Sequence, residues 1–132
     1  MDSSKATLKG IITKLLATTA ITTLVSTRIY SYIPQNTTYP YIRVGIESEQ
    51  DFSFNETDFT HKIRVQTFSQ TNTPKEAMDT REAIFNALNR ATLTLDSPHV
   101  SNGIQVGPLF NCFQEDDGKT WQSIIEFDMS VT

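Results

Sequence analysis

The residue types that most often perform nucleophilic or acid–base chemistry are scarce in this chain. It has two histidines, His61 and His99, and one cysteine, Cys112. His61 lies at the start of a predicted strand and His99 beside a proline in a predicted loop, and neither belongs to a recognisable catalytic motif. Cys112 lies in an apolar run without an evident cationic neighbour, so we interpret it as a small buried residue rather than a reactive thiol. These residues predict no catalytic centre.

Patterns that bind metals or phosphates are also missing from the sequence. No HxxxH, CxxC or HExxH spacing offers a zinc ligand set. The run Glu115-Asp116-Asp117 lacks the alternating oxygen ligands and the closing glutamate of a calcium loop, so we interpret it as a solvated turn. None of the five glycines forms a phosphate-binding glycine motif. We therefore expect no cofactor, and we expect that the protein is not an enzyme.

Length, composition and charge narrow the class of protein. The chain has 132 residues, 38% hydrophobic and 20% charged, which predicts one globular domain over residues 1–132. The net charge of −4 argues against duplex binding as the main activity, because duplex-binding modules carry a basic surplus. The apolar segment from Gly10 to Val25 is interrupted by threonines and Lys14, and it is too short to span a bilayer, so we expect no membrane association.

The first amphipathic helix is predicted near the start of the chain. Apolar residues at three- and four-residue spacing predict a helix from about Ser4 to Thr18; they are Leu8, Ile11, Ile12, Leu15 and Leu16. Gly10 interrupts this helix at a cost of up to about 1 kcal/mol relative to alanine. The residues from Ile21 to Val25 predict a short further turn that leads into Arg28-Ile29-Tyr30.

The second helix is predicted from Pro74 to about Arg90. Thr73 can cap its start, Pro74 suits the first helical position, and Glu76 would complete a capping box. The expected apolar face consists of Ala77, Met78, Ile84, Phe85 and Leu88.

Four strands are predicted in two hairpins. Alternating residues predict a strand after Tyr39-Pro40-Tyr41 and a second strand around Ile63 and Val65. Residues 104–114 and 120–131 predict the other hairpin, joined by an Asp-Gly turn, and Gly107-Pro108 indicates a bulge or an edge position. The predicted fold is therefore α+β, with a four-stranded antiparallel sheet, two amphipathic helices on one face and the order α-β-β-α-β-β.

The link between the first two strands is the first candidate interaction surface. Its sequence, QDFSFNETDF, places three phenylalanines among three acidic residues: Asp51, Phe52, Phe54, Glu56, Asp58 and Phe59. Exposed apolar clusters often mark partner surfaces, and aromatic residues often anchor them. The same rings can instead fold back to cover the domain's own core. Both interpretations remain open at this point.

Three basic residues on the polar face of the first hairpin are the second candidate surface. Arg43, Lys62 and Arg64 can pair across strands with Glu47 or Glu126, which would contribute about 0.2–1 kcal/mol per pair. Alternatively, they contact an acidic neighbouring subunit. The structural interpretation is favoured, because most surface charges merely solvate a sheet face.

Several segments together resemble a known family. In chain order they are Leu24-Val25-Ser26-Thr27-Arg28-Ile29-Tyr30, Ile33-Pro34-Gln35, Tyr39-Pro40-Tyr41-Ile42, Val65-Gln66-Thr67-Phe68-Ser69 and Asp117-Gly118-Lys119-Thr120-Trp121. Each segment is common, but their order and spacing resemble the tail-completion (tail terminator) family of tailed phages, prophages and gene transfer agents. The resemblance covers nearly the whole chain.

The resemblance implies a structural virion protein without catalytic residues or cofactor. It would be assembled in the host cytoplasm into a hexameric ring at the head-proximal end of the tail tube, in the role of the lambda-type terminator. Its partners would be copies of itself, the tail tube protein and the head–neck connector or head-closure protein, with DNA only as passing cargo. Among the matching residues, Trp121 would anchor the core, Pro40 would mark the entry to a strand, and Gly118 would serve a turn.

Two other interpretations remain. The chain can be another neck component, such as a head-closure or adaptor ring subunit, or a small enzyme or regulatory domain with no role in the virion. For a ring subunit, the acidic composition leads us to expect acidic side chains along a bore that lets DNA pass.

Overall fold

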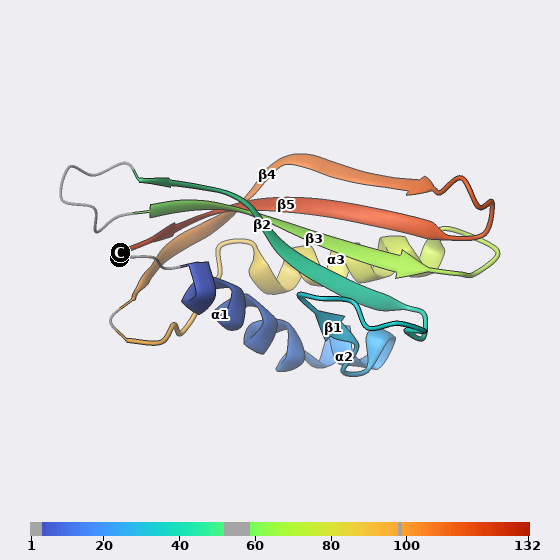
Figure 1. Cartoon of the computed structure of the whole chain (residues 1–132), viewed down its shortest axis with the longest axis horizontal. Coiled ribbons are helices and arrows are strands. Elements are labelled where there is room, and N and C mark those ends of the chain that lie inside the picture. The colour runs from blue at the N-terminus through green and yellow to red at the C-terminus, as the bar shows by residue number, and fades with distance from the viewer. Residues whose placement is uncertain (1–3, 52–58, 98) are drawn as a thin grey trace.

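Three helices lie on one face of a five-stranded sheet (Figure 1). The computed structural model describes residues 4–51, 59–97 and 99–132. In chain order, the elements are α1 (Ser4–Leu16), α2 (Thr19–Val25), β1 (Ile29–Tyr30), β2 (Tyr41–Asp51), β3 (Phe59–Ser69), α3 (Lys75–Leu88), β4 (Ser101–Gln114) and β5 (Trp121–Val131).

The order of the strands in the sheet is β1-β2-β3-β5-β4. The two predicted hairpins, β2–β3 and β4–β5, are both present, and β3 pairs antiparallel with β5 to join them. The prediction of two helices and four strands is wrong in two details, since β1 adds a short parallel strand beside β2 and α2 is a helix in its own right. A helix of seven residues is too short to be stable alone. It forms because Ile21 and Val25 pack into the core.

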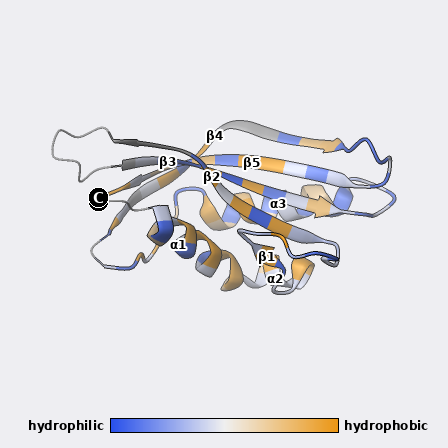
Figure 2. Ribbon diagram, viewed as in Figure 1, coloured by the Kyte–Doolittle hydropathy of each residue, from blue (hydrophilic) through white to orange (hydrophobic). Residues whose placement is uncertain are grey.

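The core lies between the helices and the sheet, and period-two alternation determines which strand residues enter it. Figure 2 shows apolar residues along the helices and the strands that face them. The buried cluster comprises Ile11, Leu15, Ile21, Val25, Ile29, Ile42, Val44, Ile63, Val65, Ile84, Leu88, Leu93, Ile104, Ile125, Phe127, Met129 and Val131. Full burial of one such side chain contributes about 1.5–3 kcal/mol, so this layer supplies most of the stabilisation.

The structure explains why a glycine interrupts α1. A Cβ atom at Gly10 would lie 2.5 Å from Cδ2 of Leu95 and 3.5 Å from the carbonyl oxygen of Thr94. The segment that follows α3 therefore passes directly against α1, and the contact needs a residue without a side chain. At the same place Lys9 Nζ lies 2.9 Å from the Asp96 carboxylate.

The start of α3 differs from the predicted capping box. Glu76 does not fold back onto the helix start, because its Oε1 accepts a hydrogen bond from the Ser69 hydroxyl at 2.6 Å. The Thr73 hydroxyl accepts only a long hydrogen bond, 3.4 Å, from the Lys75 N–H. The predicted apolar face is correct for Ala77, Ile84 and Leu88, but Met78 is 44% exposed and Thr80 is buried in its place.

The β4–β5 hairpin agrees with most of its prediction. Gly118 has a φ of 72°, which suits the predicted turn residue, and the register of β4 shifts between Val106 and Phe110, at the expected bulge. Trp121 is only half-buried and lies outside the central cluster, so its expected role as core anchor is wrong. Ile125 and Phe127, further along the strand, fill the centre instead.

Within the part of the chain that the structure describes, no single helix is long and apolar enough to cross a membrane. The pair α1 and α2 reaches the necessary length and composition only together, and the chain bends by 82° between them.

Candidate assembly interface

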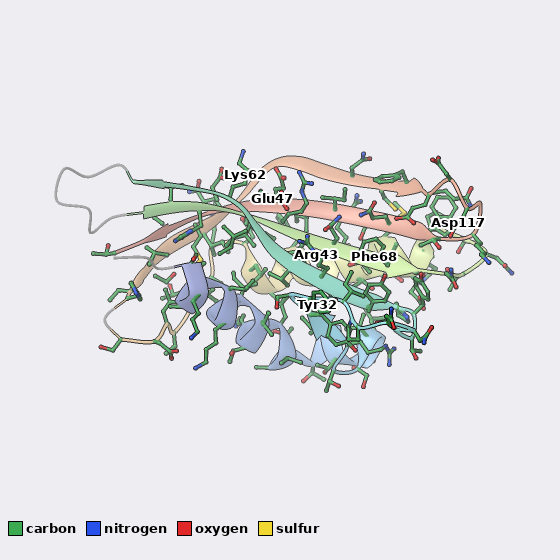
Figure 3. All side chains as sticks on the ribbon, in the orientation of Figure 1. Tyr32, Arg43, Glu47, Lys62, Phe68 and Asp117 are labelled. Carbon is green, nitrogen blue, oxygen red and sulfur yellow. The ribbon has the colours of Figure 1, made fainter. Side chains whose placement is uncertain are left out.

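The face of the sheet opposite the helices has no second layer over it among the described residues (Figures 1 and 3). Residues that alternate with the core residues of each strand lie on this open face. Arg43 of β2 pairs in register with Gln66 of β3, and Arg64 pairs with Glu126 of β5. The sequence correctly predicted that Arg43, Lys62 and Arg64 share this polar face.

A network of ion pairs crosses the middle of the open face. Arg64 donates from Nε and Nη2 to one oxygen of Glu126, at 2.9 and 2.8 Å. The same arginine lies 3.9 Å from Glu47, which also lies 4.0 Å from Arg43. Arg43 donates to the Gln66 side-chain oxygen at 2.9 Å. The Glu126 side chain is only 7% exposed, so this carboxylate depends on Arg64 for its charge partner.

These contacts confirm the predicted cross-strand pairing for Arg64, whereas Arg43 lies near Glu47 of its own strand and bonds across strands only to Gln66. Lys62 lies on the same face, opposite Asp128 of β5 in the register of the sheet. A role for the three cations at a subunit interface stays a prediction. Because the arginines are already paired within the chain, a partner would have to compete with existing ion pairs.

Four aromatic rings gather at one end of the open face, where sequence reasoning placed no site. The Tyr41 ring stacks on Phe68 with centroids 5.0 Å apart, and Tyr39 and Tyr30 lie 5.2 and 6.5 Å from Tyr41. Burial, followed by the nearby Tyr39 and Glu115, raises the pKa of Tyr41 to about 12. The alternation of β2 contained this signal, because Tyr41 has the same parity as Arg43 and so must share its face.

The acidic turn between β4 and β5 is built around Asp117. Its Oδ1 accepts hydrogen bonds from the N–H groups of Lys119 and Thr120, at 3.0 and 2.8 Å, and its Oδ2 accepts one from the Thr120 hydroxyl at 2.6 Å. These hydrogen bonds lower the pKa of Asp117. Burial and the neighbouring carboxylates raise the pKa of Glu115. Asp117 thus stabilises the fold of the turn.

The loop predicted from its phenylalanines joins β2 to β3. Phe52, Phe54, Glu56 and Asp58 lie outside the described residues. The flanking residues end and begin strands, Asp51 in β2 and Phe59 in β3. The choice between a core cover and a partner surface therefore stays open.

The residues considered for chemistry lie apart from one another. His61 is fully buried on the helix-facing side of β3, in register with Met129. Cys112 is half-buried on β4, where burial raises its pKa and Arg81 acts weakly in the opposite direction. Across the described ranges, no three His, Cys, Asp or Glu side chains converge as a metal-ligand set.

The comparison with protein families is decisive for identity. Residues 9–132 match the family described as "Tail completion protein gp17". The chain belongs to this family. A tail completion protein is a structural component of the virion, and the resemblance seen in the sequence is confirmed.

A solved structure shares the fold of this tail completion protein. One chain from the "Virion of native gene transfer agent (GTA) particle" superposes with a TM-score of 0.86 at 19% identity, and the match covers 96% of this chain and 95% of that chain. At this identity the likeness establishes the fold alone. No match to a curated protein sequence reaches significance.

Proposed function

We propose that this tail completion protein is the tail terminator, which forms a hexameric ring on the last layer of the tail tube, ends its polymerisation and joins it to the head–neck connector. Membership of the tail completion family over residues 9–132 carries this proposal. The similar chain in a gene transfer agent particle supports it, because that chain belongs to a virion.

The architecture suits such a role. A ring subunit needs a core that is complete before assembly and different surfaces for its two neighbours, because head-to-tail interfaces are heterologous. The helices already bury one face of the sheet, so open strand edges and the other face are free for contacts. The net charge of −4 favours the passage of DNA through a bore rather than its retention.

Deletion of the gene in a particle-producing cell tests the proposal. We expect overlong or headless tails under the electron microscope, and restoration of normal length by the intact chain supplied from a plasmid. Leaky heads beside tails of normal length would instead identify a head-closure or adaptor ring subunit. Normal particles that lack the chain would exclude any role in the virion.

A further inference from the structure

The charged residues of the chain are distributed unevenly. Of its 11 Lys and Arg and 15 Asp and Glu, only Arg28 falls within the stretches 15–42 and 97–114. Charged residues make up 20% of the whole chain, so both stretches are strongly depleted. Arg28 is itself half-buried, and its Nε donates to the Pro40 carbonyl oxygen at 2.9 Å. The two stretches therefore form surface that is almost free of charge.

The fold places the two stretches on opposite sides of the molecule. Residues 15–42 comprise the end of α1, α2, β1 and the segment that leads into the start of β2, whereas residues 97–114 contain β4. β1 and β4 are the two edges of the sheet, and Figure 1 shows them on opposite borders. We call the first the α2–β1 side. The second, together with the adjacent flank of α3, is the β4 side.

The large exposed apolar side chains of the described residues all belong to these two sides. Among the described residues, the large apolar side chains that remain exposed are Leu16, Tyr32, Met78, Val100, Val106 and Phe113. Leu16 and Tyr32 belong to the α2–β1 side, and Tyr32 is 85% exposed. The other four belong to the β4 side. Of these six side chains, Phe113 lies on the open face of the sheet, at its β4 edge.

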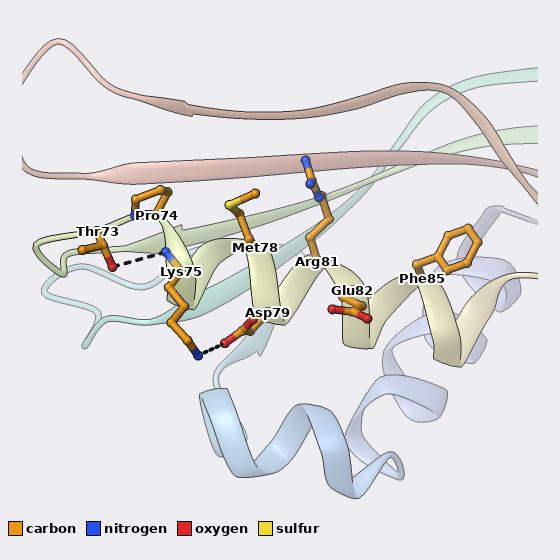
Figure 4. A pocket seen from close by; sticks show the side chains of 8 residues that line it. All are labelled: Thr73, Pro74, Lys75, Met78, Asp79, Arg81, Glu82 and Phe85. Carbon is orange, nitrogen blue, oxygen red and sulfur yellow. Dashed lines mark hydrogen bonds and ion pairs between the residues drawn. The ribbon is translucent and has the colours of Figure 1, made fainter.

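The flank of α3 on the β4 side is grooved. An open groove of about 490 Å³ is lined by Pro74, Met78, Arg81 and Phe85, among others (Figure 4). Met78 and Arg81 project from α3 towards β5 and β4, and Lys75 and Asp79, which also line the groove, form an ion pair with each other. The groove thus combines the apolar side chains of Pro74, Met78 and Phe85 with the charged side chains of Lys75, Asp79, Arg81 and Glu82.

β4 carries no charges to protect its sheet edge, although Pro108 and the register shift between Val106 and Phe110 interrupt part of it. Natural edge strands that stay exposed are commonly short or carry charges that discourage pairing with another chain. β4 has 14 residues and no Asp, Glu, Lys or Arg. At the opposite edge, β1 covers part of β2, and β2 carries charges such as Arg43 and Glu47. The contrast indicates that another chain covers β4 in the assembled state.

We propose that copies of this chain associate head to tail, with the α2–β1 side of one copy against the β4 side of the next. The proposal rests on the proposed ring and names its subunit contact. Closed rings need two different surfaces on opposite sides of each subunit, and interface centres are poor in charge and rich in Tyr and Met. The stretches 15–42 and 97–114 contribute no charge except the half-buried Arg28, so the charges at this contact would come from the groove of α3. A two-fold dimer through β4 would leave Leu16 and Tyr32 in water.

Photocross-linking tests this contact. The chain is made with benzoylphenylalanine in place of Tyr32 and, as a control on the central strand of the open sheet face, in place of Lys62. Both are irradiated in purified particles and as the concentrated chain. We expect Tyr32 to give a cross-linked dimer, with the second peptide mapping by mass spectrometry to residues 97–114 or 73–85. Cross-links to another protein, to another part of a second copy, or at a yield no higher than that of the control would overturn the proposal.

The outcome is separable from that of the proposed function. If tube capping fails but Tyr32 still cross-links to the β4 side of a second copy, the subunit contact stands and only the terminator role falls. If capping succeeds but the cross-links map elsewhere, the ring stands and this contact falls.

Discussion

The two faces of the sheet use the same strands in different ways. On the covered face, Ile63 and Val65 of β3 are fully buried against helices and gain their stability from the removal of apolar surface from water. On the open face, Arg64 and Gln66 of the same strand make directional contacts to Glu126 and Arg43. The difference teaches that the network in the middle of the open face pairs its charged groups within one chain. Among the described residues, the charge-poor sides have no such network and expose apolar side chains, so a partner would remove more apolar surface from water there.

The largest effect on stability is expected on the covered face. Ile84→Asp places a charge on the fully buried side of α3 and should lower the free energy of unfolding by several kcal/mol, which suffices to unfold the chain. The matched control is Asn86→Asp on the exposed side of the same helix, expected to change stability by less than about 0.5 kcal/mol. Circular dichroism and urea denaturation measure both. Equal stability of the two variants would mean that this face of α3 is not the buried one.

A smaller effect is expected from the ion pairs of the open face. Arg64→Met removes the charge partner of Glu126, whose carboxylate then remains nearly buried, and should cost about 1–3 kcal/mol. Adding Glu126→Gln should recover part of that loss, because the buried charge is gone. Lys62→Met on the same face is the control, with an expected change within about 0.5 kcal/mol. If Arg64→Met changed the free energy of unfolding no more than the control does in urea denaturation, the network would not stabilise this face.

A pH-dependent effect is expected at the β4–β5 turn. Hydrogen bonds hold the folded-state pKa of Asp117 below its ordinary value of 3.8. Its contribution is therefore fully present above pH 3.8 and is lost as the pH falls further, through the folded-state pKa. Urea denaturation at several pH values should show a shallower decline for Asp117→Asn than for the wild type in this acidic range. Identical pH profiles would show that the turn does not depend on the carboxylate.

The smallest effect on stability, with a large effect on assembly, is expected at the two sides. Tyr32→Asp and Val106→Asp alter exposed residues, so each variant should fold normally. Each alone should fail to form rings, but a mixture should form a dimer through its one intact contact, as measured by native mass spectrometry at concentrations where the wild type forms rings. Dimers of Tyr32→Asp alone would indicate a two-fold contact through β4 instead.

Local patterns predicted much of this fold because they report directly on burial. The alternation of Ile42 and Val44 and the Asp-Gly signal at Gly118 located the hairpins, and helical spacing located Ile84 in the core. Patterns of this kind depend on residues that are close in sequence. α2 and β1 were underestimated because a seven-residue helix and a two-residue strand exist only through tertiary contacts.

Other errors arose where a long-range contact overrode a local rule. Glu76 bonds to Ser69 rather than to its own helix start, and Met78 faces an open groove although its spacing suits the core. The sequence indicated only that Gly10 destabilises its helix. The reason for a glycine there is the close approach of Leu95, which lies far away in sequence. The proposed cations on the open face were located correctly. The charge-poor stretches were equally visible in the sequence, but their placement on opposite edges required the topology.

The break in the register of β4 between Val106 and Phe110 has a consequence for the solubility of the free chain. An incoming strand that pairs with one half of β4 is out of step with the other half, so a continuous cross-chain ladder cannot grow along its whole length. The bulge thus limits the pairing of β4 strands from successive copies, which would otherwise extend into fibres. The unassembled chain can therefore keep an uncharged edge strand for its subunit contact with a lower risk of aggregation.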